Sequence, residues 1–182
     1  MSMTTNKLNV CHINIRSLSD VKIDALKADI LENHDILCLT ETNLPHARVG
    51  CLNLPGFQHI IAKNRVERQG GGVAIYVADH IGAIRMNDFE LPGLEVLWSK
   101  IKAGNNVLML ATCYRPPNSG RDFWNKLQDS IDTVKQAGYN DIILAGDFNA
   151  DPETREGSHL KYLVDSNNFV LHVDEPTRVT PN

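Results

Sequence analysis

The feature that most constrains the fold is a series of short apolar segments that recurs along the whole chain. Each segment has the length of a buried β-strand and is bounded by polar or glycine-containing turns, and the first is rich in β-branched residues. The segments cover residues 8–15, 35–40, 57–63, 73–77, 94–102, 107–114 and 141–145, and a further strand is expected at 169–173. A chain with this pattern is expected to build its core around β-sheet.

Helical periodicity appears toward both ends of the chain and is absent from its middle. Residues 21–31 have apolar side chains at helical spacing after Ser19 or Asp20, either of which is placed to cap a helix. Residues 122–136 form an amphipathic helix, and a last helix is expected over 158–166. In the middle, the strands 94–102 and 107–114 flank Ala103-Gly104-Asn105-Asn106, which has hairpin chemistry.

Helix-separated strands at both ends around an antiparallel middle predict an α/β fold. We expect a layered α/β sandwich, with two mixed β-sheets packed together and helices outside. The 182 residues, of which 42% are apolar, are enough to bury one sizeable core, and no linker or repeat divides them. The sequence therefore predicts one domain over residues 1–182.

The composition excludes several function classes. A formal net charge of −4 provides no broad basic surface, which argues against a protein that only binds DNA. The four cysteines form no CxxC pair, so neither a zinc site nor a disulfide framework is expected, and the thiols are predicted to be buried. No apolar segment approaches the roughly 20 residues of a membrane span. We expect a soluble intracellular chain.

Polar side chains follow the predicted strands at the points where those strands end. Amide and carboxylate oxygens at strand ends suit a hard cation such as Mg²⁺, which keeps waters for substrate phosphates. Each residue alone has an ordinary interpretation as a turn former or a solvated strand end, and it is their conjunction that indicates phosphate chemistry. The groups are Asn14 with Arg16 and Ser17, Glu41 with Asn43, Tyr114 with Arg115, and Asp147 with Asn149.

Two other candidate features carry less weight. The glycine run Gly70–Gly72 lacks the Lys-Ser/Thr of a phosphate-binding loop and enters a strand, so a hairpin or a close backbone approach is predicted there. The seven histidines show no HxxxH or HxH spacing, and none is assigned a catalytic role.

Six short motifs occur in an order that resembles the endonuclease/exonuclease/phosphatase superfamily. The resemblance is greatest to the apurinic-endonuclease-like domain of non-LTR (LINE-type) retrotransposons, and it covers essentially the whole chain. The motifs are His12-Ile13-Asn14-Ile15-Arg16-Ser17, Leu39-Thr40-Glu41-Thr42, Gly70-Gly71-Gly72-Val73-Ala74-Ile75-Tyr76-Val77, Cys113-Tyr114-Arg115-Pro116-Pro117, Gly146-Asp147-Phe148-Asn149 and Pro176-Thr177-Arg178.

This resemblance implies Mg²⁺-dependent nicking of double-stranded DNA, with Mn²⁺ as a possible substitute. Glu41 looks like a direct metal ligand, and Asn14 looks like a residue that helps to hold the metal or the scissile phosphate. Tyr114 resembles the family's phosphate-contacting tyrosine, Asp147 the residue that orients or deprotonates water, and Asn149 a hydrogen-bond donor to the phosphate. The product 3′-hydroxyl would prime a reverse transcriptase domain encoded downstream in the parent polyprotein, in the nucleus.

The same resemblance suggests where DNA would be contacted. Thr177 matches a family position near the DNA backbone, and the neighbouring motif arginines Arg16, Arg115 and Arg178 are further candidates. Outside the motifs, Lys63, Arg65 and Arg68 form a local basic cluster that could contact the DNA backbone or could simply be a solvated hairpin edge.

The chain also departs from the family pattern. In the family, a strand carrying an aspartate and a Ser-Asp-His motif follow the Pro-Thr-Arg segment, whereas this sequence runs only to Asn182. The match therefore corresponds to the N-terminal three quarters of the family domain, and its last strands are expected to be lacking. Without the histidine we expect weak or no nicking, and an open sheet edge would favour a homodimer or strand exchange.

Two alternatives of other kinds stay open. One is a non-catalytic DNA-binding or interaction protein that keeps the fold and has lost the chemistry. The other keeps the superfamily but changes the substrate to a non-DNA phosphodiester, such as a phosphoinositide, sphingomyelin or a nucleotide. The Tyr-Arg-Pro-Pro and Pro-Thr-Arg segments favour the retrotransposon branch.

Overall fold

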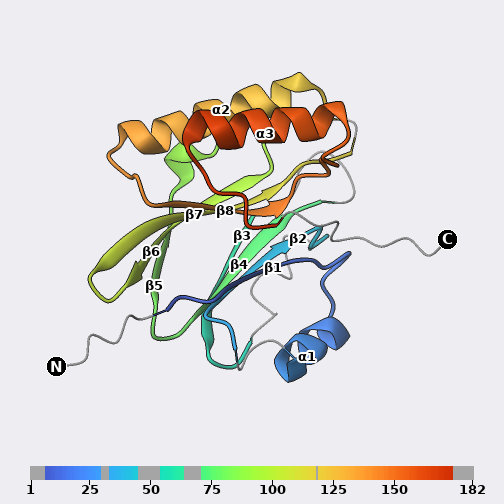
Figure 1. The fold of residues 1–182 in the computed structure, drawn as a ribbon. Coiled ribbons are helices and arrows are strands. Elements are labelled where there is room, and N and C mark those ends of the chain that lie inside the picture. The colour runs from blue at the N-terminus through green and yellow to red at the C-terminus, as the bar shows by residue number, and fades with distance from the viewer. Residues whose placement is uncertain (1–6, 30–32, 45–53, 64–70, 118, 174–182) are drawn as a thin grey trace.

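The computed structural model describes residues 7–29, 33–44, 54–63, 71–117 and 119–173, which form two four-stranded sheets packed against each other (Figure 1). The first sheet has the order β1-β2-β4-β3 and the second the order β5-β6-β7-β8. The strands are β1 (Val10–Asn14), β2 (Ile36–Thr40), β3 (Phe57–Lys63), β4 (Val73–Ala78), β5 (Gly82–Arg85), β6 (Val96–Ala103), β7 (Asn106–Tyr114) and β8 (Ile142–Asp147). This confirms the predicted layered α/β sandwich.

Both sheets are mixed, and each has one parallel pair. β1 runs parallel to β2, and β7 runs parallel to β8, while the remaining neighbours are antiparallel. In register, Asn14 lies opposite Thr40 at the end of the first parallel pair, and Tyr114 lies opposite Asp147 at the end of the second. Carboxyl ends of parallel strands share one edge of a sheet, so the polar residues that follow these strands gather there.

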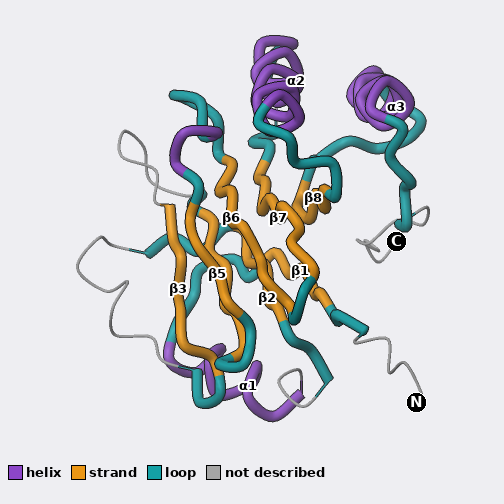
Figure 2. The backbone as a smooth tube through the Cα atoms, turned by 90° about the vertical axis from the view of Figure 1, so that its left-hand side faces the viewer, coloured by secondary structure: helices purple, strands orange, loops and turns teal. Residues whose placement is uncertain are grey.

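The helices cover the outer faces of the sandwich. α2 (Arg121–Gln136) and α3 (Arg155–Asn167) lie over the second sheet, and α1 (Asp20–Asp29) lies on the opposite side (Figure 2). The inner core between the sheets contains Ile36 and Ile75 from the first sheet and Leu97 and Leu110 from the second, all fully buried. None of the helices within the described ranges has the length and apolar content that a membrane crossing requires.

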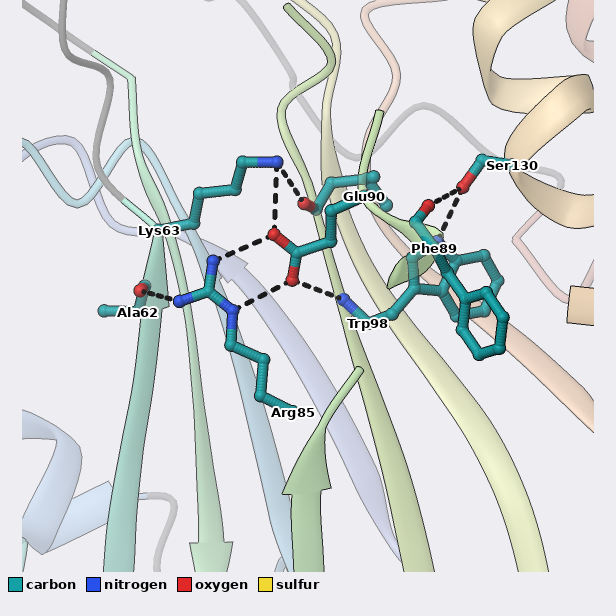
Figure 3. A network of polar contacts seen from close by, with 8 residues as sticks. Ala62, Lys63, Arg85, Phe89, Glu90, Trp98 and Ser130 are labelled. Carbon is teal, nitrogen blue, oxygen red and sulfur yellow. Dashed lines mark hydrogen bonds and ion pairs between the residues drawn. The ribbon is translucent and has the colours of Figure 1, made fainter. Parts of the chain in front are cut away.

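A cluster of charged side chains fastens the two sheets together, and we call it the Glu90 clasp (Figure 3). Glu90 is 6% exposed and pairs with Arg85 of β5 through Nε at 3.0 Å and Nη2 at 2.8 Å. The same carboxylate pairs with Nζ of Lys63, from β3, at 3.2 Å. Arg85 also donates to the carbonyl of Ala62 at 3.1 Å, and Lys63 to that of Val96 at 3.1 Å. The clasp therefore joins one edge of each sheet.

Three predicted elements differ from the structure. The strand expected at 169–173 was wrong: the N–H of Phe169 bonds the carbonyl of Val164 at the end of α3, and the residues after it pair with no described strand. An extended segment with no partner strand leaves its main-chain groups unpaired, so apolar composition alone did not make a strand. β5 was missed because it is short and opens on glycine, and α3 begins earlier than predicted, after the capping side chain of Thr154.

Candidate active site

Side chains from three strand ends meet around the amide of Asn14, at the end of β1. Asn14 Nδ2 donates to Glu41 Oε1 at 3.0 Å and to Asp147 Oδ2 at 2.8 Å. Glu41 directly follows β2, and Asp147 ends β8, so the amide joins the first sheet to the second. A single nitrogen thus holds two carboxylates that come from distant parts of the sequence.

The backbone around this amide adopts conformations that side chains disfavour. A residue with a Cβ pays a steric penalty at positive φ, and such residues persist only where the surrounding structure fixes them. Within the described residues, positive φ at non-glycine positions occurs at Arg16 (45°), Ser17 (76°), Glu41 (53°), Asn43 (49°) and Asn149 (44°), and otherwise only at the helix cap Asn168. The strained positions therefore coincide with the polar turns that follow β1, β2 and β8.

The turn after β2 is held against the segment before β4. Thr42 N–H donates to the carbonyl of Gly72 at 3.2 Å, and Asn43 N–H donates to that of Gly71 at 2.9 Å. Gly72 has φ +88°, and a Cβ added there would lie 2.6 Å from Thr42 Oγ1. The Gly72 N–H donates in turn to Glu95 Oε2 at 3.1 Å. The glycine run thus permits a close backbone approach, one of the two possibilities that the sequence indicated.

The turn after β8 orients the second carboxylate. Asp147 Oδ1 accepts the Asn149 N–H at 3.0 Å, which leaves Oδ2 directed toward the amide of Asn14. Asn149 Nδ2 donates to the carbonyl of Arg115 at 2.7 Å, and Arg115 N–H donates to the carbonyl of Asp147 at 2.8 Å. Both polar side chains of the turn are therefore fixed by main-chain partners.

Tyr114, the last residue of β7, completes the group as a protonated phenol. Burial raises its pKa above the ordinary value, and a hydrogen bond to the carboxylate of Glu41 and the negative charge of Asp147 raise it further. The phenol therefore keeps its proton across the physiological range and acts as a donor.

The residues present fit a hard divalent cation. No trio of histidine, cysteine, aspartate or glutamate side chains in the described ranges could surround a metal, but Mg²⁺ is ordinarily held by one or two carboxylates and keeps several waters. Glu41 and Asp147 supply two carboxylates on either side of one amide nitrogen. A cation bound by Glu41 beside this group would offset the repulsion between the two carboxylates, which a neutral amide separates.

The candidate DNA contacts lie in different places. Arg16 is exposed at the same edge as Asn14. Arg115 is 1% exposed and its guanidinium points inward, so we correct the expectation that it meets DNA: burial keeps this charge from a phosphate backbone. Lys63 belongs to the Glu90 clasp. The other candidates, Arg65, Arg68, Thr177 and Arg178, lie outside the described residues.

One neighbour of the site was missed by the sequence reasoning. His12 lies two residues before Asn14 on β1, and its Nε2 is 3.1 Å from Thr40 Oγ1. Burial lowers the pKa of His12, and the negative charge of Asp147 partly opposes that effect. Residues two apart on a strand share a face, so the spacing from Asn14 was the signal that could have identified it.

Comparison with known proteins identifies the relatives of this arrangement. The model of the Endonuclease/Exonuclease/phosphatase family matches residues 9–181. No curated protein matches the sequence. Among solved structures, the endonuclease domain of TRAS1, a telomere-specific non-LTR retrotransposon, is similar with a TM-score of 0.65 and 16% identity, covering 88% of this chain and 71% of that domain.

Other similar structures have different activities. The 3′-5′ exonuclease NExo from Neisseria meningitidis has a TM-score of 0.64 and 18% identity, with 87% of this chain and 71% of that chain covered. The mannosyl-6-phosphatase Bt3783 from Bacteroides thetaiotaomicron has a TM-score of 0.58 and 16% identity, with 84% and 69% covered. At such identities the likeness shows the shared fold and does not select a substrate.

Proposed function

Since the chain belongs to the endonuclease/exonuclease/phosphatase family, whose members are hydrolases, we propose that this site cleaves a phosphodiester of double-stranded DNA with Mg²⁺. The observation that carries the proposal is the amide of Asn14 held between Glu41 and Asp147 at 3.0 and 2.8 Å. This arrangement gathers two carboxylates and amide donors at the end of parallel strands, where a metal and a phosphate group could be bound together.

Each residue has a distinct task in the proposed reaction. Glu41 and Asn14 would hold Mg²⁺, which when bound offsets the charge that develops on the phosphate oxygens. Asp147 orients the attacking water through Oδ2 and accepts its proton. Tyr114 would turn its single O–H from Glu41 to a non-bridging phosphate oxygen, and burial keeps that proton in place. Asn149 would donate the second N–H of its amide, because the first is bound to the Arg115 carbonyl. Water attacks phosphorus as the P–O bond to the 3′ oxygen breaks, which leaves a 5′-phosphate and a 3′ oxyanion that takes a proton from solvent to become the 3′-hydroxyl.

The biological setting that we propose is target-site nicking for a non-LTR retrotransposon. A reverse transcriptase domain of the same polyprotein would extend the 3′-hydroxyl in the nucleus. Asn14, Glu41 and Asp147 lie at strand ends that we call the catalytic edge. Among the candidates that the structure describes, Arg16 is the one proposed to contact DNA, because it is exposed next to this edge. Arg65, Arg68, Thr177 and Arg178 remain proposed contacts on sequence grounds. A homodimer or a strand exchange through an open sheet edge remains a proposal of the same kind.

A second candidate function is hydrolysis of a phosphate ester outside DNA. The formal net charge of −4 favours it, because a DNA-binding surface is ordinarily basic. The similar fold of a sugar phosphatase shows that this architecture accommodates such substrates.

The test is nicking of supercoiled plasmid in Mg²⁺, in Mn²⁺ and in excess chelator. Asp147→Asn and Glu41→Gln are each expected to lower the nicking rate by about 100- to 10,000-fold, because each removes a charged group from the reacting centre. Asp129→Asn, the same change at an exposed position on α2, serves as the matched control and should leave the rate unchanged.

Mn²⁺ binding, followed by electron paramagnetic resonance, separates the alternatives. Tight Mn²⁺ binding that Glu41→Gln weakens, with cleavage of small phosphate esters and none of plasmid, would favour the second candidate. If the chain binds DNA but neither binds Mn²⁺ nor cleaves any ester, the result would favour the non-catalytic interpretation. Nicking at equal rates by the parent chain and Asp147→Asn would refute the assignment of this site.

A further inference from the structure

Arg115 directly follows Tyr114, yet no step of the proposed reaction uses its charge. Its guanidinium instead binds main-chain oxygens on two different segments. Nη1 donates to the carbonyl of Asn149 at 3.0 Å and to that of Phe148 at 3.4 Å. Nη2 donates to the carbonyl of Ser119, just before α2, at 2.7 Å. The side chain thus links the catalytic turn to the start of the helix layer.

The rest of its surroundings keep the guanidinium in this orientation. It lies over the ring of Trp124, with Cζ 5.3 Å from the ring centroid, and this ring stacks on Phe148 at 6.4 Å. The carboxylate of Glu156, in the first turn of α3, is 3.7 Å from Nη2. A buried arginine needs partners for its charge, and here carbonyl oxygens and an aromatic face provide most of them.

The main chain of Arg115 is bound to the same turn from the other side. Its N–H donates to the carbonyl of Asp147 at 2.8 Å, and its carbonyl accepts from Asn149 Nδ2 at 2.7 Å. Asn149 has φ 44°, a conformation that requires support from its surroundings. Both the main chain and the side chain of Arg115 therefore fix the turn that presents Asp147 and Asn149.

We propose that Arg115 is a positioning residue, which sets the place of Asp147 and Asn149 and does not contact the substrate. The proposal rests on the proposed function only for the reaction that it predicts to slow. A lysine could not replace it, because one ammonium group cannot reach the separate carbonyls of Ser119 and Asn149 as the guanidinium fork does.

The test compares Arg115→Met and Arg115→Lys with the same two changes at Arg121, an exposed arginine that opens α2. Arg115→Met retains much of the volume without burying an unpaired charge, so it is the variant expected to fold most readily. We expect kcat for plasmid nicking to fall about 10- to 100-fold in both Arg115 variants, because small displacements of reacting groups slow catalysis by that order. KM for DNA and its dependence on salt should stay unchanged.

A direct contact to DNA would give the opposite pattern. In that case KM would rise and the salt dependence would become shallower, with kcat retained, and this result would overturn the proposal. Unchanged kcat and KM in Arg115→Met would overturn it as well. All variants are compared at a temperature where circular dichroism shows the native state.

A second measurement requires no activity. The Asn149 N–H bonds Asp147 Oδ1 at 3.0 Å, so its hydrogen exchange reports whether the turn keeps its place. Exchange measured by NMR should be at least about 10-fold faster in Arg115→Met, with the amides of β4 unaffected. If the unsubstituted chain cleaves no DNA, this exchange rate still decides the role of Arg115: an unchanged rate overturns it.

Discussion

The catalytic edge and the Glu90 clasp both surround a partly or fully buried arginine, but the shortest contacts of the two arginines go to different kinds of group. Each also has one contact of the other kind, Arg85 with the Ala62 carbonyl at 3.1 Å and Arg115 with the Glu156 carboxylate at 3.7 Å. Arg85 in the clasp meets a carboxylate through two nitrogens, at 3.0 and 2.8 Å. Arg115 at the catalytic edge meets main-chain carbonyls on two segments. A carboxylate is carried by a side chain that can change rotamer, whereas a carbonyl belongs to the backbone, so an arginine bound to carbonyls on two segments ties those segments together. The clasp is therefore suited to holding sheets together, and the edge is suited to fixing a geometry.

The largest effect on stability is expected from breaking the Glu90 clasp. Glu90→Gln leaves Lys63 and Arg85 facing each other without their shared carboxylate, so the free energy of unfolding should fall by about 2–4 kcal/mol. The affinity for Mn²⁺ should stay within about twofold, because the clasp side chains, in the described part of the chain, hydrogen-bond none of Asn14, Glu41 and Asp147. Urea unfolding and a metal titration measure the two quantities.

Glu153→Gln, at an exposed position before α3, is the matched control for that change and should leave both quantities unchanged. A loss of Mn²⁺ affinity in Glu90→Gln that is comparable to its loss of stability would show that the two regions are not separate.

An intermediate effect is expected from two glycines that share a backbone conformation. Gly72 and Gly56 have φ of +88° and +83°, but only Gly72 has a neighbour in the way of a Cβ, Thr42 Oγ1 at 2.6 Å. Positive φ destabilises both alanine variants. The free energy of unfolding should fall by about 1–2 kcal/mol more in Gly72→Ala, because its Cβ must also displace Thr42. Thermal or urea unfolding gives the difference between them.

Gly72→Ala should also weaken Mn²⁺ binding, since Thr42 follows the proposed ligand Glu41, whereas Gly56→Ala should not. Equal losses of stability in the two variants, or retained metal affinity in Gly72→Ala, would mean that the close approach does not fix the edge.

The smallest effect is expected in the pH dependence of stability, and it concerns the interior of β2, the strand that precedes Glu41. Burial raises the pKa of the Cys38 thiol from 9.0 to about 12. Because the folded-state pKa is the higher one, the stability contribution of the neutral thiol is full below about pH 9 and is lost as the pH rises toward 12. Between pH 8 and 10 the parent chain should lose about 1 kcal/mol more than Cys38→Ala does, in urea unfolding. Parallel pH profiles would show that water reaches this strand.

Much of the fold followed from local pattern. Short apolar runs such as Ile36–Thr40 and Val73–Ala78 favour a buried central strand, and the structure has both as central strands of the first sheet. Local sequence was misleading where strand pairing decides whether a segment becomes a strand. Residues 169–173 have the composition of a strand, but no described strand pairs with them. The short β5 has a weak sequence signal, yet it pairs with β6 along its whole length.

The sequence indicated which residues belong to the candidate site, but it did not show how they are connected. Asn14, Glu41, Tyr114 and Asp147 stood out as polar residues at strand ends, and the two parallel pairs bring them to one edge. The sequence could not show that the Arg115 side chain points inward, because an arginine that follows a strand is expected at the surface unless its buried partners are known. The proximity of His12 to Asp147 depends in the same way on how the sheets pack.

The hydrogen bond from Asn14 to Asp147 joins residues 133 positions apart and spans both sheets. During synthesis, the first sheet can be complete while the ribosome has yet to supply the strand that carries Asp147. Neither half of the sandwich holds both carboxylates, so a chain that is still emerging, or one whose sheets have come apart, has no site at all. Packing of the two sheets is thus a precondition for the proposed chemistry, and the proposed cleavage of DNA would be withheld from every partly folded form.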